Sequence, residues 1–197
     1  AVVPSVLNAV HPADGVDLQA YNQLASWTYF MNASSVAATI WYTFMGHYMA
    51  DTFGDEYKAQ NATSLDYPLF DTLENLTIRD PSSHWFSNVS GGTVRTQTRD
   101  DVIRQAFNDT VRDLTGRLGP TTASWTWGSI HSREFDHLSG LAALQRGPIS
   151  AGGDGFTLNV AGGLTSKGGP SWRQIIDLSN PDGSLAIYPG GQSGDPL

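Results

Sequence analysis

The clearest hydrophobic periodicity in the chain lies between Thr98 and Pro120. Apolar residues recur there at intervals of three and four, which is the spacing of one face of an α-helix. They are Val102, Ile103, Ala106, Phe107, Val111, Leu114 and Leu118. Thr98 with Asp101 three residues later resembles a capping box, and Gly119 followed by proline is a typical helix end. The pattern predicts an amphipathic helix of about 20 residues with both ends signalled.

A second, more hydrophobic helix is expected over residues 36–52. Ser34 or Ser35 is a suitable N-cap for it, and Gly54 is the expected stop. The segment is apolar nearly all round, which indicates burial on more than one side. It contains a histidine and an aspartate, so the pattern indicates a buried helix and not a bilayer span.

The remaining patterns of the first half are weaker. Short helices are expected near residues 17–27 and 68–76, the second with a proline in its first turn. Residues 1–16 are punctuated by Pro and Gly, which predicts an extended entry segment. Residues 79–97 are rich in Ser, Thr and Gly, and we expect a loop there.

After Pro120 the pattern changes to short aromatic and β-branched runs separated by Gly, Pro, Asn and Asp. The runs are SWTWGSI, FTLNVAG, SWRQIIDL and SLAIYP. The last two span Trp172 to Leu178 and Ser184 to Pro189, and Asn-Pro-Asp-Gly between them predicts a turn and hence a hairpin. We therefore predict an α+β fold, with a mainly helical region over 1–120 and a β-rich segment over 121–197.

Composition narrows the class of protein. The chain has 197 residues, is 40% hydrophobic and contains six Trp, which is enough for one large or two small packed domains. The absence of cysteine excludes disulfides, thiolate metal sites and a Cys nucleophile. A net charge of −8 makes nucleic acid or an anionic membrane a poor partner, because phosphate binding needs Lys and Arg.

Five Asn-x-Ser/Thr sequons suggest a secreted, periplasmic or otherwise extracellular protein, although short motifs also arise by chance. They begin at Asn32, Asn61, Asn75, Asn88 and Asn108.

The segment from His131 to His137 gathers potential metal ligands or bases. It contains His131, Glu134, Asp136 and His137, but no His-x-x-x-His pair at helical spacing. A polar connection whose histidines bond the backbone explains it more simply than a metal site, so we expect no metal and no cofactor.

Two glycine-rich segments, 152–155 and 162–163, lack the Gly-x-x-x-x-Gly-Lys-Ser/Thr pattern and are expected to be turns and not anion cradles.

No catalytic residue can be assigned from the pattern. Ser132, Ser171 and Ser193 are possible nucleophiles, but none lies in a Gly-x-Ser-x-Gly motif. Asp177, near Arg173, is interpreted as a structural ion pair or a solvent-facing acid. The sequence therefore predicts no complete catalytic site within these residues.

The tail GPSWRQIIDLSNPDGSLAIYPGGQSGDPL resembles the C-terminal part of the large subunit of the penicillin acylase (penicillin amidase) family of N-terminal nucleophile hydrolases. WTWGSIHSREFDHL, GGDGFTLNVA and the aromatic stretch ASWTYFMNASSVAATIWYTFM also resemble that family. The likeness is most specific from Trp125 to Pro196 and weak from Tyr57 to Arg95. It implies that the glycine-rich terminus is an internal loop of a longer enzyme.

The resemblance implies a precursor that cleaves itself, and a Ser at the new N-terminus that acts as nucleophile and base. Ala1 has no nucleophilic atom, and the Asn of the oxyanion hole lies upstream in the family, so its role is not transferred to Asn159. The chain is then expected to be an inactive scaffold within an αββα sandwich. Its partners are the remainder of its precursor and a small-molecule amide such as an N-acyl β-lactam or acyl-homoserine lactone. Family members can hold structural calcium, for which these residues show no ligand set.

Two other hypotheses remain open. A secreted, non-catalytic binding module predicts an exposed aromatic groove, and a metallohydrolase predicts that the histidines at 131 and 137 converge. The scaffold hypothesis instead predicts that Trp125, Trp127 and Trp172 are buried and that broad apolar surfaces stay exposed.

Overall fold

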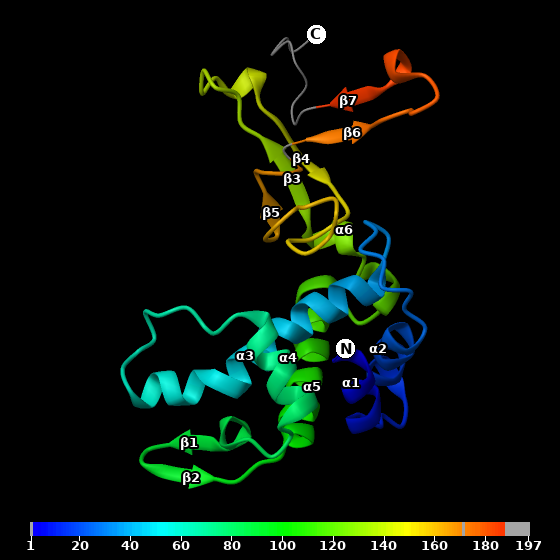
Figure 1. Cartoon of the computed structure of the whole chain (residues 1–197). Helices are drawn as coiled ribbons and strands as arrows, with labels where there is room; N and C mark the ends of the chain where they lie inside the picture. The colour runs from blue at the N-terminus through cyan, green and yellow to red at the C-terminus, as the bar shows by residue number, and fades with distance from the viewer. Residues whose placement is uncertain (1, 171, 188–197) are drawn as a thin grey trace. The chain divides into compact units, whose positions relative to one another are not determined.

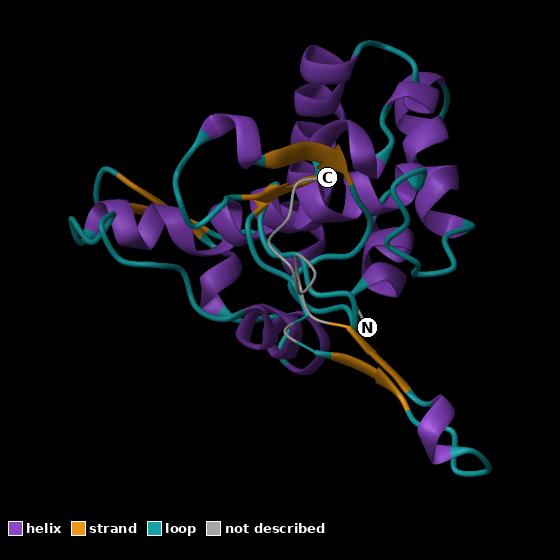
Figure 2. Ribbon diagram, turned by 90° about the horizontal axis from the view of Figure 1, so that it is seen from above, coloured by secondary structure: helices purple, strands orange, loops and turns teal. Residues whose placement is uncertain are grey.

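The computed structural model describes residues 2–170 and 172–187. The fold is α+β, with several helices and short antiparallel and mixed strands (Figure 1). It divides into two compact units. Unit 1 comprises Ala1–Thr28 and Thr39–Trp125, and unit 2 comprises Tyr29–Ala38 and Thr126–Leu197. Figure 2 separates helices in purple from strands in orange.

Unit 1 is built on helix α5, Arg99–Leu118, which confirms the strongest sequence pattern. Thr98 Oγ1 accepts from the Asp101 N–H, and the Asp101 carboxylate accepts from the Thr98 N–H, so the predicted capping box is present. Gly119 ends the helix with φ 93°. All the predicted apolar positions except Leu118 are buried.

Helices α1 (Val3–Ala9) and α2 (Gly15–Ala25) pack against α5. The prediction of an extended entry segment over 1–16 is therefore wrong. Pro4 lies in the first turn of α1, where a missing N–H costs nothing, and Val3 and Val6 are buried. Tertiary burial of these valines outweighs their modest helix propensity.

Helix α3 runs from Val36 to Ala59, and Ser35 Oγ accepts from the Ala38 N–H as its cap. The predicted stop at Gly54 is wrong, because a glycine inside a helix costs only about 1 kcal/mol. A Cβ at Gly54 would lie 2.8 Å from the Tyr67 hydroxyl, so the glycine makes room for that ring. Helix α4, Phe70–Arg79, begins two residues after the predicted start.

The loop predicted over 79–97 contains regular structure. A 3₁₀ turn, η1 (His84–Phe86), precedes an antiparallel hairpin of β1 (Asn88–Ser90) and β2 (Thr93–Arg95). Gly91 and Gly92 connect the strands with φ 56° and 79°, the conformation of a two-residue hairpin turn. The sequence signal was this Gly-Gly pair between short β-branched runs.

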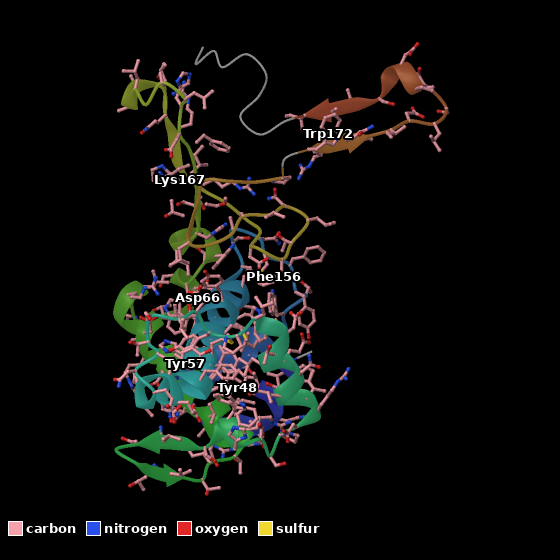
Figure 3. The ribbon with its side chains drawn as sticks, turned by 60° about the vertical axis from the view of Figure 1, so that its left-hand side comes forward. Tyr48, Tyr57, Asp66, Phe156, Lys167 and Trp172 are labelled. Atoms are coloured by element: carbon pink, nitrogen blue, oxygen red, sulfur yellow. The ribbon has the colours of Figure 1, made fainter. Side chains whose placement is uncertain are left out.

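The core of unit 1 is aromatic. Phe44 stacks on Tyr48 with ring centroids 5.3 Å apart, and Tyr48 stacks on Phe86 at 6.4 Å. The Tyr48 hydroxyl hydrogen-bonds Thr77 Oγ1 at 2.9 Å, and burial raises the pKa of Tyr48 to about 12. These contacts join α3 to α4 and η1 (Figure 3).

Unit 2 contains a three-stranded sheet of order β4-β3-β5. Strand β3 (Ser132–Phe135) is antiparallel to β4 (Arg146–Ser150) and parallel to β5 (Thr165–Ser166), with an irregularity between Arg133 and Phe135. The 3₁₀ turn η3, Ala142–Leu144, precedes β4. Helix α6, Trp127–Ile130, leads into β3.

The predicted C-terminal hairpin is confirmed. Strand β6, Arg173–Ile175, pairs antiparallel with β7, Leu185–Ile187, across the 3₁₀ turn η4, Pro181–Gly183. Both strands are shorter than the predicted runs, and Tyr188 and Pro189 lie outside the described residues.

Two other predicted strands are wrong. SWTWGSI begins at the last residue of the 3₁₀ turn η2 (Thr122–Ser124) and continues into α6, and its two tryptophans, Trp125 and Trp127, are fully buried without strand pairing. FTLNVAG forms turns and bends. There the Asp154 carboxylate accepts from the Phe156 N–H, and this local bond competes with strand formation.

Candidate functional site

The most organised polar arrangement in unit 2 is centred on Trp127 and His131, which we call the Trp–His pair. Helix α6 brings the two rings one turn apart, with centroids 4.5 Å apart and planes at 13°. Both side chains are fully buried. Trp127 Nε1 donates to the Gly153 carbonyl at 2.8 Å, and His131 Nδ1 lies 2.9 Å from the Gly163 carbonyl. Through these two contacts the Trp–His pair bonds both glycine-rich segments, 152–155 and 162–163.

The chemistry of His131 follows from this bonding. A carbonyl only accepts, so Nδ1 carries the proton and Nε2 is left with a lone pair. Nε2 is buried and has no hydrogen-bond partner among the described residues. Burial lowers the pKa of His131, and the positive charge of Arg133 lowers it further. The ring is thus neutral near pH 7 and sealed from substrate, which suits a positioning role and not general-base catalysis.

Glycines around the pair permit close backbone approach. Gly128 N–H donates to the Ala33 carbonyl and Gly153 N–H to the Met31 carbonyl, each at 2.7 Å. A Cβ at Gly152 would lie 2.7 Å from that same Met31 carbonyl. Residues 29–38 therefore pack within unit 2 although they are far from it in sequence.

The segment 152–155 is irregular up to Asp154 and enters a turn at Gly155. Gly153 N–H bonds the Met31 carbonyl, and Asp154 N–H bonds Thr157 Oγ1 at 3.0 Å. Ala161 N–H donates to the Asp154 carbonyl and closes the segment. These N–H groups already have acceptors within the protein, whereas an anion cradle needs free ones.

The structure disperses the acids and histidines of the 131–137 segment. Lys167 Nζ lies 2.8 Å from Asp136 Oδ2 and 3.8 Å from Glu134 Oε2, so both acids face this cation (Figure 3). His131 is in the Trp–His pair, and His137 lies in an exposed turn. Within residues 2–170 and 172–187 no group of three or more His, Asp or Glu is placed to hold a metal ion.

Sequence reasoning missed one Ser–His contact. His137 Nδ1 lies 2.8 Å from Ser139 Oγ, but it also lies 3.1 Å from the Ser139 N–H. Ser139 Oγ in turn accepts from the Leu141 N–H at 3.3 Å. These are the local bonds of an exposed turn, without a third group to orient the imidazole. The spacing His-x-Ser is the only sequence signal for it.

The other candidates have structural roles or lie outside the described part of the chain. Ser132 begins β3, and its N–H donates to the Leu164 carbonyl. Asp177 is solvent-facing, as one of its two interpretations held, and accepts from the Ser179 N–H and hydroxyl. Hydrogen bonds from Ser179 lower its pKa. Asn159 accepts from Arg133, while Ala1, Ser171 and Ser193 are not among the described residues.

Unit 2 exposes a large set of apolar side chains, which we call the apolar surface of unit 2. It comprises Leu138, Leu141, Ile149, Phe156, Leu158, Val160, Leu164, Trp172, Ile175, Ile176, Leu178, Leu185 and Ile187. Trp172 is 52% exposed, so its predicted burial is wrong, whereas Trp125 and Trp127 are buried as expected. Trp172 directly precedes β6 (Figure 3), and its Nε1 donates to Gln174 Oε1 at 2.7 Å.

The β6–β7 register places large apolar residues on one face of this hairpin. Ile175 lies opposite Leu185, and Ile187 is on the same face two residues along β7. Gln174 and Ala186 pair on the other face. The side chains of Ile175, Leu185 and Ile187 are exposed, so this face is available to another part of the enzyme.

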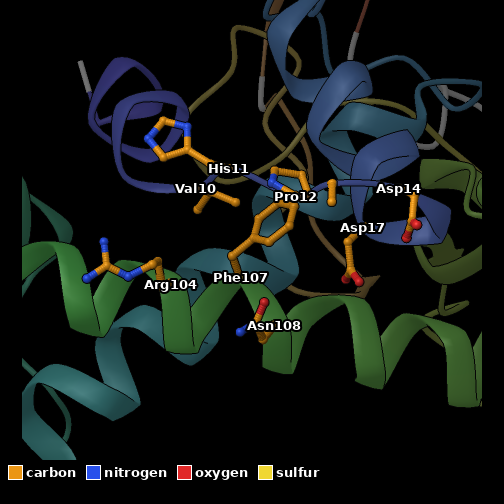
Figure 4. A pocket seen from close by; sticks show the side chains of 9 residues that line it. Val10, His11, Pro12, Asp14, Asp17, Arg104, Phe107 and Asn108 are labelled. Carbon is orange, nitrogen blue, oxygen red and sulfur yellow. The ribbon is translucent and has the colours of Figure 1, made fainter.

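Cavities lined by described residues occur in unit 1. One, of about 290 Å³, lies between α5 and the α1–α2 connection; His11, Asp17, Arg104 and Asn108 are among its lining residues (Figure 4). Another, of about 260 Å³, is lined by Tyr57, Tyr67 and neighbouring residues at the end of α3. Neither has a serine in its lining.

Across the described residues, no helix combines the length and hydrophobicity needed to cross a bilayer.

Comparison with known proteins identifies relatives along the whole chain. The family model described as penicillin amidase matches residues 1–197. The chain is 26% identical over 194 residues to the acyl-homoserine lactone acylase QuiP of Pseudomonas fluorescens (strain Pf0-1), covering 91% of this chain and 23% of that protein. It is also 26% identical over 212 residues to QuiP of Pseudomonas aeruginosa, covering 90% and 24% respectively. The chain thus spans about a quarter of the length of these relatives. From its first residue to its last, it belongs to the penicillin amidase family.

Proposed function

We propose that this chain is a supporting part of an amidohydrolase that cleaves linear amide bonds. One observation carries the proposal: the whole chain matches a family named for amide hydrolysis, while its described residues contain no nucleophile paired with an oriented base. Both relatives described above are named acyl-homoserine lactone acylases, which makes N-acyl-homoserine lactones a substrate class to test alongside N-acyl β-lactams. The nucleophile is an N-terminal Ser carried outside these residues.

The partner of this chain is the remainder of the same precursor. The many exposed apolar side chains of unit 2 support this, because an enzyme part that docks onto its remainder leaves such side chains uncovered when it is taken alone. An isolated two-stranded hairpin is only marginally stable in water, so β6–β7 needs neighbours. In the assembled enzyme these strands extend an αββα sandwich, and the Trp–His pair keeps the glycine-rich loops in place behind them.

The test compares the full-length precursor with the 197-residue chain. Both are purified and incubated with an N-acyl-homoserine lactone and an N-acyl β-lactam, and released amine is measured by chromatography. The precursor should mature and hydrolyse at least one substrate, and the 197-residue chain should hydrolyse neither. Amide hydrolysis by the short chain alone refutes the scaffold proposal.

A second candidate is a secreted, non-catalytic binding module. The exposure of Phe156 (83%) and Trp172 (52%) favours it, because exposed aromatic rings are suited to stacking on ligands. This reading expects the chain alone to bind an oligosaccharide in a glycan array, with binding abolished by Trp172→Ala. The scaffold reading expects no such binding, and expects Trp172→Ala to weaken association with the rest of the precursor.

A further inference from the structure

The sequons are more frequent than composition alone explains. The chain has nine Asn, and five are followed by Ser or Thr two positions later. Ser and Thr together account for 36 of 197 residues, so about two such coincidences are expected by chance. Some of these five sequons have a structural explanation, and the others do not.

Two of the five are explained by helix packing. Thr77 and Thr110 are buried, and each hydroxyl donates at 2.7 Å to the carbonyl four residues earlier, Leu73 and Ala106 respectively. Thr77 also meets the Tyr48 hydroxyl. These threonines are therefore needed inside α4 and α5, and the sequons beginning at Asn75 and Asn108 are by-products of that need.

The sequon of Asn88 has no such explanation. Asn88 begins the β1–β2 hairpin, and both Asn88 and Ser90 are exposed. Asparagine is disfavoured in strands, and no hydrogen bond of this side chain is found within the described part of the chain. The backbone of this segment pairs with β2, while both side chains of the sequon project into solvent beside the two-glycine turn.

The sequon of Asn61 lies in the turn that follows α3. Asn61 has φ 52°, a left-handed conformation that asparagine tolerates better than most residues, which accounts for the Asn but not for Thr63. Both side chains are exposed. Asp55, six residues before Asn61, accepts from the Val89 N–H, so this end of α3 is joined to the strand that Asn88 begins (Figure 1).

The sequon of Asn32 differs because its backbone is engaged in unit 2. The Ala33 carbonyl accepts from Gly128 N–H, and the Asn32 Cα would lie 3.5 Å from a Cβ at Gly152. This segment is packed and not a free surface loop, so we assign no modification to it.

We propose that Asn61 and Asn88 carry N-linked oligosaccharides. In the transfer, Nδ2 of the asparagine forms a bond to C1 of the sugar while the C1–O bond to a lipid-pyrophosphate donor breaks. The amide nitrogen loses one proton, and the lipid pyrophosphate leaves. The reaction requires an exported chain.

Glycans on Asn61 and Asn88 would restrict how the chain assembles with the rest of its precursor. Two glycans near the end of α3 and the β1–β2 hairpin would keep that part of unit 1 in solvent. The remainder of the precursor must then dock elsewhere, and the apolar surface of unit 2 is available for it.

The test uses the protein isolated from the organism that produces it. Peptides containing Asn61, Asn75, Asn88 and Asn108 are sequenced by a fragmentation method that preserves glycosidic bonds. Carbohydrate is expected on the Asn61 and Asn88 peptides and absent from the Asn75 and Asn108 peptides. Unmodified Asn61 and Asn88, or carbohydrate confined to the helical sequons, overturns the proposal.

Matched variants expressed in the same organism separate glycan loss from misfolding. Ser90→Ala and Thr63→Ala should each remove one glycan mass, and Ser90→Thr should retain it. Hydrolytic activity of the full-length enzyme is measured on the same samples and should persist in Thr63→Ala. If the enzyme hydrolyses its substrate but carries no glycan, the glycan proposal is wrong and the proposed enzymatic function is retained. If it carries the glycans but does not hydrolyse an amide, the glycan proposal is retained and the proposed enzymatic function is wrong.

Discussion

The imidazole of His131 stacks on the indole of Trp127, and each ring bonds the carbonyl of a different glycine-rich segment. The two contacts make one buried unit out of α6, Gly153 and Gly163. His131 Nε2 has no partner among the described residues, so a second proton on the ring would place an uncompensated charge in the interior.

This arrangement makes unit 2 sensitive to acid. The pKa of His131 is lowered in the folded state, so below about pH 6.5 the unfolded chain binds a proton that the folded chain resists. The free energy of unfolding of unit 2 should therefore be higher near neutral pH and fall as the pH drops. The positive charge of Arg133 disfavours the protonated form of His131, and the negative charge of Asp154 favours it.

Hydrogen exchange measured by mass spectrometry on residues 146–166, corrected for intrinsic rates, should show faster opening at pH 5 than at pH 7.5. His131→Gln keeps an amide donor for Gly163 but does not titrate in this range. Its exchange should be less dependent on pH, and an unchanged dependence would contradict the role given to His131.

Trp127→Phe should destabilise unit 2 by about 1–3 kcal/mol. Phenylalanine retains much of the ring packing but lacks the Nε1–H that donates to the Gly153 carbonyl, which leaves that buried acceptor unpaired. Trp172→Phe is the control, because this exposed ring should change stability by less than about 0.5 kcal/mol. Urea unfolding of both variants provides the comparison, and equal losses would argue against the Trp–His pair.

Gly153→Ala should cost more than about 1 kcal/mol. Gly153 has φ 88°, and an added Cβ would clash with the Asn159 carbonyl. Gly162→Ala is a matched control in the same region, since a Cβ there would meet nothing within 4 Å. Thermal unfolding should separate the two variants clearly, and similar melting temperatures would be inconsistent with the close backbone approach described.

Asp101→Ala should destabilise unit 1 by about 0.5–2 kcal/mol at pH 6, because it removes half of the capping box of α5. Hydrogen bonds from Thr98, with help from Arg104, lower the pKa of Asp101 to about 2. The stabilisation is present above the ordinary Asp pKa near 3.8 and is lost as the pH falls toward 2. Acid unfolding followed by circular dichroism should show a weaker pH dependence below pH 4 in the variant.

Glu56→Gln should stabilise unit 1 at neutral pH. Burial raises the pKa of Glu56 to about 7, and the neighbouring Asp55 side chain raises it further. Between the ordinary value near 4.5 and about 7 the unfolded chain gives up the proton first, so stability falls as the pH rises. The free energy of unfolding, measured from pH 4.5 to 8, should decline less in the variant than in the original protein. Parallel curves for the two proteins would show that Glu56 does not cause the decline.

The parts of the fold that could be predicted have local causes. Helix α5 depends on apolar residues at i, i+3 and i, i+4 spacing and on the capping box of Thr98 and Asp101, all of which lie in one short segment. The β6–β7 hairpin depends on the turn residues at 180–183.

Long-range packing decided the rest. Val3 and Val6 are buried in a helix that packs against α5, and the Tyr67 hydroxyl occupies the space where a Cβ at Gly54 of α3 would lie. Met31 and Gly153 meet across more than a hundred residues, so no local window of sequence contains that contact or the Trp–His pair beside it. Residue types and short-range spacing determined which chemistry and which turns were available, whereas burial, which needs distant segments to come together, decided where each side chain lies.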